Sequence, residues 1–411
     1  MFATVRELNQ HFIDLWWESD TGDARLPDLG PLFTPEAQTQ NEKALLHFLE
    51  QVDQMFSNPP RSREDAQAAQ ARLGASFRCL AEEALGFTPE QLDLLPSQAF
   101  SDVSEEFVRA ARAFDPGLSG EDIYQAGRNA WTAHGLQWLL GMPVQLTPSI
   151  LAYSLLYPYT DNYLDDTDIT VATKVSFNER FRHRLAGDAI APANGHERMI
   201  FDLVAMIEKQ YSRSNSPAVF ESLLDIHHAQ SESLNLLRRA AAPGEVDVLG
   251  LSFHKGGTSV LADGYLVSGS LNEAQRRYTY GHGIFAQLLD DMEDVETDSQ
   301  AGRLTIYSQP AGHWTLDALA NRTFRFGRSV LKGLDCFDCD ESVRELIRRG
   351  ADLFLIDAIG RMDRYYSQSY LHALEAHSPF RFSVMKEQRE AFFRRHGSLG
   401  KLMDAILQLR L

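Results

Sequence analysis

Two short stretches of this 411-residue chain concentrate aspartates at helical spacing. The first contains Asp161, Asp165, Asp166 and Asp168, and within it Asp161, Asp165 and Asp168 follow the pattern i, i+4, i+7. Residues with that spacing lie on one face of a helix, where like charges destabilise the helix by about 0.2–0.5 kcal/mol per pair. Bound cations would offset this repulsion.

The second stretch contains Asp290, Asp291, Asp294 and Asp298, and within it Asp290, Asp294 and Asp298 follow i, i+4, i+8. Magnesium takes one or two carboxylates from a protein and completes its shell with water and phosphate oxygens. Two carboxylate faces across a cleft would therefore hold a diphosphate through metal ions. A solvated acidic face or a helix end is the alternative for one isolated run. Because both stretches follow apolar helices whose other faces must be buried, the pair favours a metal site.

The elements that must position these clusters are helices. Apolar residues recur at every third or fourth position through most of the chain, and the alternation typical of strands is scarce. Helix starts are indicated by a capping hydroxyl before proline at Thr34-Pro35, Thr88-Pro89, Thr147-Pro148 and Ser216-Pro217. The sequence therefore predicts an all-α fold.

Composition divides the chain into two parts. Residues 1–110 are richer in Gln, Pro and charge, whereas residues 111–411 carry longer apolar helices. We expect an N-terminal helical segment packed on a larger helical domain, with the boundary between Pro96 and Gly120. At this length the chain can bury one large core or two modest ones.

Charge and composition exclude several classes of protein. Lys and Arg total 39 against 57 Asp and Glu, which gives a net charge of −18 and disfavours nucleic-acid binding. No secretion signal and no run of about 18 apolar residues is present, so we expect a cytoplasmic protein without a membrane span. Three cysteines make no disulfide framework, and Cys336 and Cys339 are predicted to lie in an acidic turn between helices rather than in a metal site.

The second cluster lies within Gly283-Ile284-Phe285-Ala286-Gln287-Leu288-Leu289-Asp290-Asp291-Met292-Glu293-Asp294. This segment resembles the second aspartate-rich motif of trans-prenyl diphosphate synthases, G-x-x-F-Q-x-x-D-D-x-x-D. Gln287 stands in register with the motif, whereas the aromatic residue, Phe285, is displaced by one position. Gly302-Arg303 is similar to the later Gly-Lys of the family, with arginine in place of lysine.

Two further segments extend the resemblance. Lys255-Gly256-Gly257-Thr258 is similar to the Lys-Thr element of the same family, with two glycines between the pair, and the first cluster resembles the first aspartate-rich motif as D-x-x-x-D-D-x-D. Over residues 120–380 the chain thus resembles the class I isoprenoid synthases, which include prenyl diphosphate synthases and metal-dependent terpene synthases. The resemblance implies a helical bundle in which one motif lies on each of two facing helices beside a central cleft.

The resemblance also implies roles for individual residues. Two or three Mg²⁺ ions would be held by the carboxylates of both clusters, namely Asp161, Asp165, Asp166, Asp290, Asp291, Asp294 and Asp298. Lys255 and Arg303 would be catalytic and bind diphosphate with Gln287 and with Arg364, which resembles the arginine of a diphosphate-capping Arg-Tyr pair. Aromatic rings that stabilise a carbocation would line the substrate pocket, with Tyr153, Tyr157, Tyr163 and Phe285 as candidates.

Departures from the family pattern bear on the substrate. Chain-elongating prenyl synthases follow the first motif with Arg-Arg-Gly and begin with Gly-Lys-Arg, which help to bind isopentenyl diphosphate. Here Asp168 is followed by Ile-Thr-Val, and only Gly127-Arg128 faintly matches the earlier element. We therefore expect a terpene synthase acting on one isoprenoid diphosphate. A prenyl diphosphate synthase, which would use isopentenyl diphosphate, and a non-catalytic metal-binding or diphosphate-binding protein are the alternatives. The resemblance also makes a homodimer an expectation.

Overall fold

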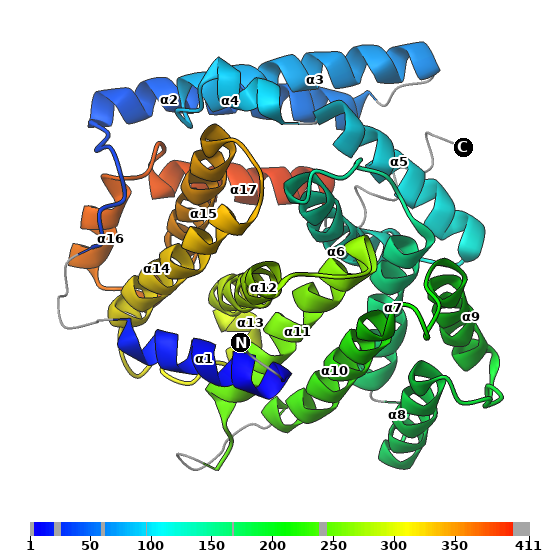
Figure 1. Ribbon diagram of the computed structural model, residues 1–411. Coiled ribbons are helices and arrows are strands. Elements are labelled where there is room, and N and C mark those ends of the chain that lie inside the picture. Colours follow the sequence, from blue (N-terminus) through cyan, green and yellow to red (C-terminus); the bar gives the residue numbers. More distant parts are fainter. Residues whose placement is uncertain are drawn as a thin grey trace.

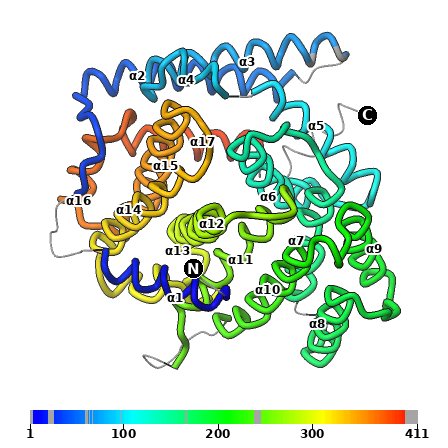
Figure 2. The backbone as a smooth tube through the Cα atoms, in the orientation of Figure 1, coloured from blue at the N-terminus to red at the C-terminus, as the bar shows by residue number. Residues whose placement is uncertain are grey.

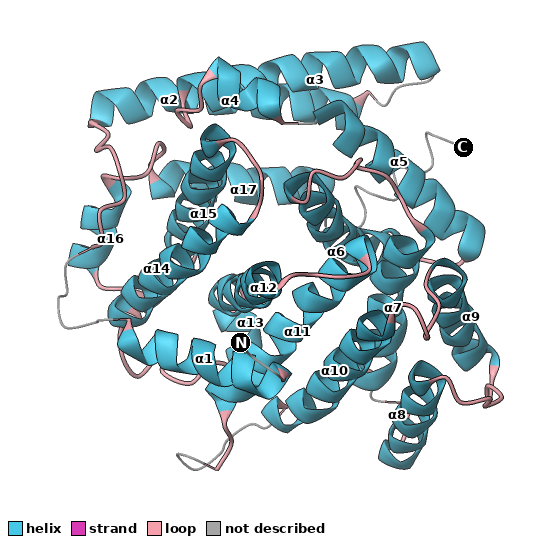
Figure 3. Ribbon diagram, in the orientation of Figure 1, coloured by secondary structure: helices cyan, strands magenta, loops and turns pink. Residues whose placement is uncertain are grey.

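The computed structural model describes residues 4–19, 26–58, 62–95, 97–166, 168–237 and 245–397, without the side chains of Arg63, Ala66 and Asp165. Over these ranges every regular element is a helix, which confirms the predicted all-α class (Figures 1 and 3). The α-helices are α1 (Val5–Glu18), α2 (Pro35–Ser57), α3 (Arg63–Glu83), α4 (Pro89–Leu94), α5 (Ser97–Phe114), α6 (Gly120–Leu139), α7 (Pro148–Asp165), α8 (Val171–Ala186), α9 (Gly195–Gln210), α10 (Pro217–Ser233), α11 (Val248–Ser268), α12 (Glu273–Glu293), α13 (Val295–Ala301), α14 (Asp317–Leu331), α15 (Glu341–Arg361), α16 (Gln368–Glu375) and α17 (Phe382–His396). Short 3₁₀ turns are η1 (Leu234–Leu236), η2 (Lys332–Cys336) and η3 (Asp363–Tyr365). None of the described helices has both the length and the apolar character that a bilayer crossing requires.

The predicted helix starts are confirmed, and their capping geometry explains them. Thr34, Thr88 and Thr147 each accept a backbone N–H from the first turn of α2, α4 and α7, and proline occupies the first helical position. Ser216 also precedes a helix that begins with proline, although its hydroxyl makes no capping hydrogen bond. The start of α7 sets the register that leads to Asp161.

Helices α11 and α12 form the tightest pair in the centre of the molecule (Figure 1). A Cβ atom on Gly283 of α12 would lie 2.2 Å from the carbonyl oxygen of Gly256 in α11, so only glycine permits this approach. A Cβ atom on Gly257 would likewise lie 2.5 Å from the buried ring of Tyr280, so packing requires both glycines that follow Lys255. Their contact brings Lys255 close to Gln287 and Asp290.

Two hydrophobic cores share α11. The first surrounds α12, α14 and α15 and includes Phe253 of α11, and the second lies among α6, α7, α8, α9 and α10 and includes Leu266 of α11. Because both cores use apolar sides of α11, the polar residues of this helix are left on a third side. That side faces the cleft described below.

The N-terminal residues contribute to two parts of the molecule. Helix α1 packs against α11, α12 and α14, and its Leu8, Phe12 and Trp16 belong to the first core. In contrast, α2 and α3 lie side by side along one edge, drawn in blue at the top of Figure 2. Their small apolar cluster includes Phe380, and Glu42 of α2 pairs with Arg381. The free thiols of Cys336 and Cys339 lie at the junction of η2 and α15 and are partly buried.

Candidate functional site

A cavity of about 210 Å³ lies where the C-terminal end of α7 faces the junction of α12 and α13. It is lined by most of the charged and polar residues that the sequence predicts for the site, from both clusters and from the segments around them. Those residues are Asp161, Lys255, Gln287, Asp290, Asp291, Asp294, Asp298 and Arg303. The fold therefore brings Asp161 of the first cluster and the aspartates of the second cluster, which are far apart in the sequence, into the lining of one cavity.

The second cluster keeps the helical register that its spacing predicts. The backbone N–H of Asp294 donates to the carbonyl of Asp290 at 2.9 Å, and the N–H of Asp298 donates to the carbonyl of Asp294 at 2.8 Å, so helical bonding continues across the α12–α13 junction. Asp290, Asp294 and Asp298 consequently form one carboxylate face at the cavity.

Crowding and burial make this carboxylate face costly. Burial raises the pKa of Asp298 to about 6, with Asp294 and Asp290 adding to the shift and Arg303, 3.7 Å from the carboxylate, opposing it. Burial and the adjacent Asp290 likewise raise the pKa of Asp294. A divalent cation at this face would stabilise the ionised carboxylates.

Basic side chains lie close to these acids. Burial of the Lys255 ammonium favours its neutral form, but Asp161, Tyr157 and Asp290 together raise its pKa above the ordinary value. Arg128 of α6 forms an ion pair with Asp290 at 2.9 Å. The cavity therefore holds permanent positive charge beside its carboxylates, an arrangement suited to an anion that arrives with metal ions.

The first cluster contributes less to the cavity than its spacing suggests. Helix α7 ends at Asp165, and the next residue, Asp166, is extended, with φ −62° and ψ 117°. The exposed carboxylate of Asp166 accepts the N–H of Asp168 at 2.8 Å and does not line the cavity. The helical face expected to continue to Asp168 therefore stops, and the side chain of Asp165 lies outside the described part of the structure. Asp161 remains as the described carboxylate on this side, where it accepts a hydrogen bond from Gln230 at 3.1 Å.

Asp291 differs from the other acids of its cluster. It is buried, and it accepts hydrogen bonds from Gln287 at 2.8 Å and from Ser252 of α11 at 3.2 Å. Burial raises its pKa to about 7, although these two hydrogen bonds lower it. Asp291 thus ties α12 to α11 beneath the cavity, and the Gln287 amide is engaged with Asp291.

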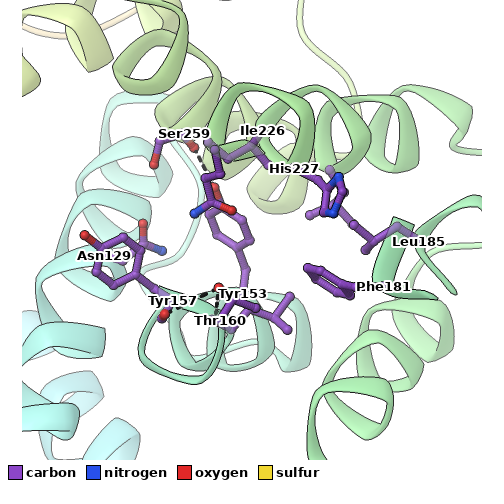
Figure 4. Close-up of a pocket in the computed structure, with 12 residues that line it drawn as sticks. Asn129, Tyr153, Tyr157, Thr160, Phe181, Leu185, Ile226, His227 and Ser259 are labelled. Atoms are coloured by element: carbon purple, nitrogen blue, oxygen red, sulfur yellow. Dashed lines mark hydrogen bonds between the residues drawn. The ribbon is translucent and has the colours of Figure 1, made fainter. Parts of the chain in front are cut away.

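An apolar pocket adjoins the cavity on the side of α7 (Figure 4). Apolar and aromatic side chains make up most of its lining, namely Tyr153, Leu156, Tyr157, Phe181, Leu185, Leu223 and Ile226. The polar side chains that also line it are Asn129, Thr160, His227, Gln230 and Ser259. Tyr157 also lines the acidic cavity, and the Tyr153 hydroxyl donates to the carbonyl of Ser259 at 3.1 Å. Two of the four predicted pocket aromatics, Tyr153 and Tyr157, therefore line this pocket.

The other selected residues lie elsewhere. Tyr163 stacks on His196 with ring centroids 4.6 Å apart and packs, partly buried, against the second core. Phe285 packs against Gly327 of α14 in the first core, because its displacement by one position turns it by about 100° around the helix. Arg364 is 56% exposed and pairs with Glu296 at 2.9 Å, outside the residues that line the cavity.

Sequence reasoning missed several polar residues of α6 and α10. Gln125 and Arg128 line the cleft from α6, as does Asn129, and Gln230 lines it from α10. The three residues of α6 are spaced i, i+3, i+4, so they form a polar stripe on one face of a helix that otherwise buries apolar residues. That stripe was the available signal, and only the helix packing shows which space it faces.

The donor set fits magnesium shared with a ligand more closely than a metal held by protein alone. Within the described ranges, no three His, Cys, Asp or Glu side chains converge into a metal-binding group. Magnesium typically binds one or two carboxylates and takes its other ligands from water and phosphate. The facing carboxylates of Asp161 and Asp290, with Lys255 between α7 and α12, suit that mode of binding.

No protein-family model matches this sequence, and the comparison with curated proteins finds no match. The motifs and the cavity therefore carry the functional argument.

Proposed function

We propose that the protein ionises an allylic isoprenoid diphosphate in a magnesium-dependent reaction, with the chemistry of a terpene synthase. The observation that carries this proposal is the single cavity shared by Asp161 of α7, the Asp290–Asp294–Asp298 face and the cations Lys255 and Arg303. Diphosphate needs both kinds of group, because it is a multivalent anion whose negative charge increases as its bond to carbon breaks. Magnesium bound by the facing carboxylates would supply Lewis-acid stabilisation of the leaving diphosphate.

The residues of the chain have separate tasks in this proposal. Lys255 and Arg303 bind the diphosphate and offset its developing charge. Asp298 orients Arg303 through their ion pair, while Asp291 and Gln287 hold the α11–α12 junction on which Lys255 stands. Tyr153 and Tyr157 offer ring faces to the carbocation, and the apolar walls around them exclude water that would otherwise quench it.

The experiment measures diphosphate release from geranyl, farnesyl and geranylgeranyl diphosphate with magnesium, followed by mass analysis of the organic product. Release that does not need isopentenyl diphosphate, with a hydrocarbon or alcohol as product, is the expected result. Asp166→Asn is the matched control for cluster variants, because Asp166 is an exposed aspartate next to α7 that does not line the cavity. Binding of the substrates without any release would favour a non-catalytic diphosphate-binding protein instead.

The second candidate function is that of a chain-elongating prenyl diphosphate synthase. A second cavity, of about 230 Å³, supports it. It shares Lys255 and Asp290 with the first cavity and is also lined by Arg128. A second diphosphate there would meet two cations. Release only in the presence of isopentenyl diphosphate, with a product longer by one isoprene unit, would establish this candidate over the first.

A further inference from the structure

Asp263 lies deep in the cleft, away from the acidic cavity. Lys255, Ser259 and Asp263 follow one another on α11 at intervals of four residues, so the three share one helix face. The rise of an α-helix separates Lys255 from Asp263 by about 12 Å. All three line the second cavity. A chain that extends from a diphosphate at Lys255 along this face therefore reaches Asp263.

The contacts of Asp263 hold its carboxyl group in a fixed orientation. The residue is 1% exposed, and one of its oxygens, Oδ1, accepts a hydrogen bond from Nδ2 of Asn129 at 3.0 Å. The same Asn129 nitrogen also donates to the hydroxyl of Ser154 at 3.2 Å. The other carboxyl oxygen, Oδ2, is buried and has no hydrogen-bond partner among the residues that the structure describes.

A buried polar atom without a partner is rare in folded proteins and needs an explanation. Burial raises the pKa of Asp263 well above its ordinary value, opposed by the Asn129 hydrogen bond, and so favours the neutral acid over the carboxylate. Oδ1 accepts from Asn129, and the proton therefore resides on Oδ2. The result is an O–H group without an acceptor at the wall of a cavity.

We propose that Asp263 is a catalytic acid that protonates a carbon–carbon double bond of the bound prenyl chain, with Asn129 as its positioning residue. This inference rests on the proposed function, since it needs an unsaturated chain in the cleft. Lys255 and the carboxylate clusters act at one end of the chain, and Asp263 acts about two helical turns away. The cleft would then perform two chemical steps at two places.

The steps balance without an added reactant. The carbocation formed on ionisation loses a proton to the departing diphosphate, which leaves a neutral polyene. The O–H bond of Asp263 then breaks as the π electrons of a double bond form a new C–H bond, so that a second carbocation and the Asp263 carboxylate result. Loss of a proton from carbon to this carboxylate forms the final double bond and restores the acid.

The test follows hydrogen from solvent into the product. The protein is incubated in D₂O long enough for buried exchangeable protons, including that of Asp263, to be replaced by deuterium. Magnesium is then added with whichever of the three prenyl diphosphates releases diphosphate. We expect the wild-type product to gain one deuterium atom on carbon. Asp263→Asn keeps the oxygen that accepts from Asn129 but loses the acid, so we expect diphosphate release within about threefold of wild type, no deuterium, and an accumulated polyene.

Ser154→Ala is the matched control, because it alters the same hydrogen-bond cluster without removing the acid, and its product should retain the deuterium. Thermal melting of each variant verifies the fold. A wild-type product without deuterium, or an unchanged product from Asp263→Asn, would overturn the inference while the proposed function stands. No diphosphate release by the wild-type protein from any substrate would overturn both.

Discussion

The two aspartate clusters look alike in sequence and differ in structure. At the α12–α13 junction helical hydrogen bonds continue through Asp294, so Asp290, Asp294 and Asp298 remain one face at the cavity. At the end of α7 the chain leaves the helix at Asp166, and Asp161 is the described carboxylate that faces the cavity. Spacing alone therefore placed too many aspartates of the first cluster on one helix face, whereas it placed those of the second cluster correctly. The reason is that i+4 relations hold only where the helix continues.

The largest expected effect separates the cluster inside the cavity from the aspartate outside it. Asp290→Ala removes a carboxylate from the intact face and should lower kcat/KM for diphosphate release by about a thousandfold or more. Asp166→Ala should change it by less than about twofold, because Asp166 does not line the cavity. Steady-state kinetics with circular dichroism, to verify helicity, makes the comparison, and equal losses in both variants would contradict the assigned difference.

The contribution of the α7 side can be measured at Asp161. Asp161→Asn keeps the hydrogen bond from Gln230 but removes the negative charge, and we expect kcat/KM to fall by about a hundredfold. The same substitution should also raise the magnesium concentration needed for half-maximal activity. Activity close to wild type at all magnesium concentrations would show that the α7 side binds no metal.

The apolar pocket beside α7 differs from the charged cavity in how it makes the stability of the fold depend on pH. His227 lines the apolar pocket and its Nε2–H donates to the carbonyl oxygen of Asn178 at 3.1 Å, and burial lowers its pKa from 6.5 to about 4. Between these values the unfolded chain binds the proton and the folded chain does not, so the free energy of unfolding decreases as pH falls. From pH 7.5 to pH 5 the loss from this group is about 2 kcal/mol.

Urea unfolding of the wild-type protein and of His227→Gln at both pH values isolates this contribution. The variant should lose about 2 kcal/mol less than the wild type on acidification, since the titrating group is gone. Acids with a raised pKa have the opposite effect, because they make the free energy of unfolding increase as pH falls. Their contribution is the same in both proteins and cancels when the two are compared. Identical pH dependence in both proteins would mean that His227 titrates normally in the folded state.

The smallest expected effect concerns the ion pair between Arg128 and Asp290. The pair is largely exposed, with side chains 59% and 42% accessible, and pairs of this kind contribute about 0.2–1 kcal/mol. Arg128→Gln frees the Asp290 carboxylate for a metal and should lower the half-maximal magnesium concentration by about two- to threefold. A magnesium titration of activity measures this shift, and an increase would assign Arg128 to substrate binding instead.

Much of the helical framework was predictable from local chemistry. Proline after a capping threonine requires no distant contact, so the starts of α2, α4 and α7 could be read directly at Thr34, Thr88 and Thr147. The all-α class followed from apolar periodicity for the same reason. Asp290, Asp294 and Asp298 shared a face because that relation depends only on helical geometry within one segment.

Tertiary packing decided which helix faces lie against one another. Gly256 and Gly283 permit the close contact of α11 with α12, which fixes the place of Lys255. Asp263 and Asn129 come from helices far apart in the sequence, and neither residue type nor spacing predicts their hydrogen bond. Sequence determined which residues lie on a common helix face, because that is a local property, whereas only the three-dimensional arrangement of the helices decided which faces meet around the cleft.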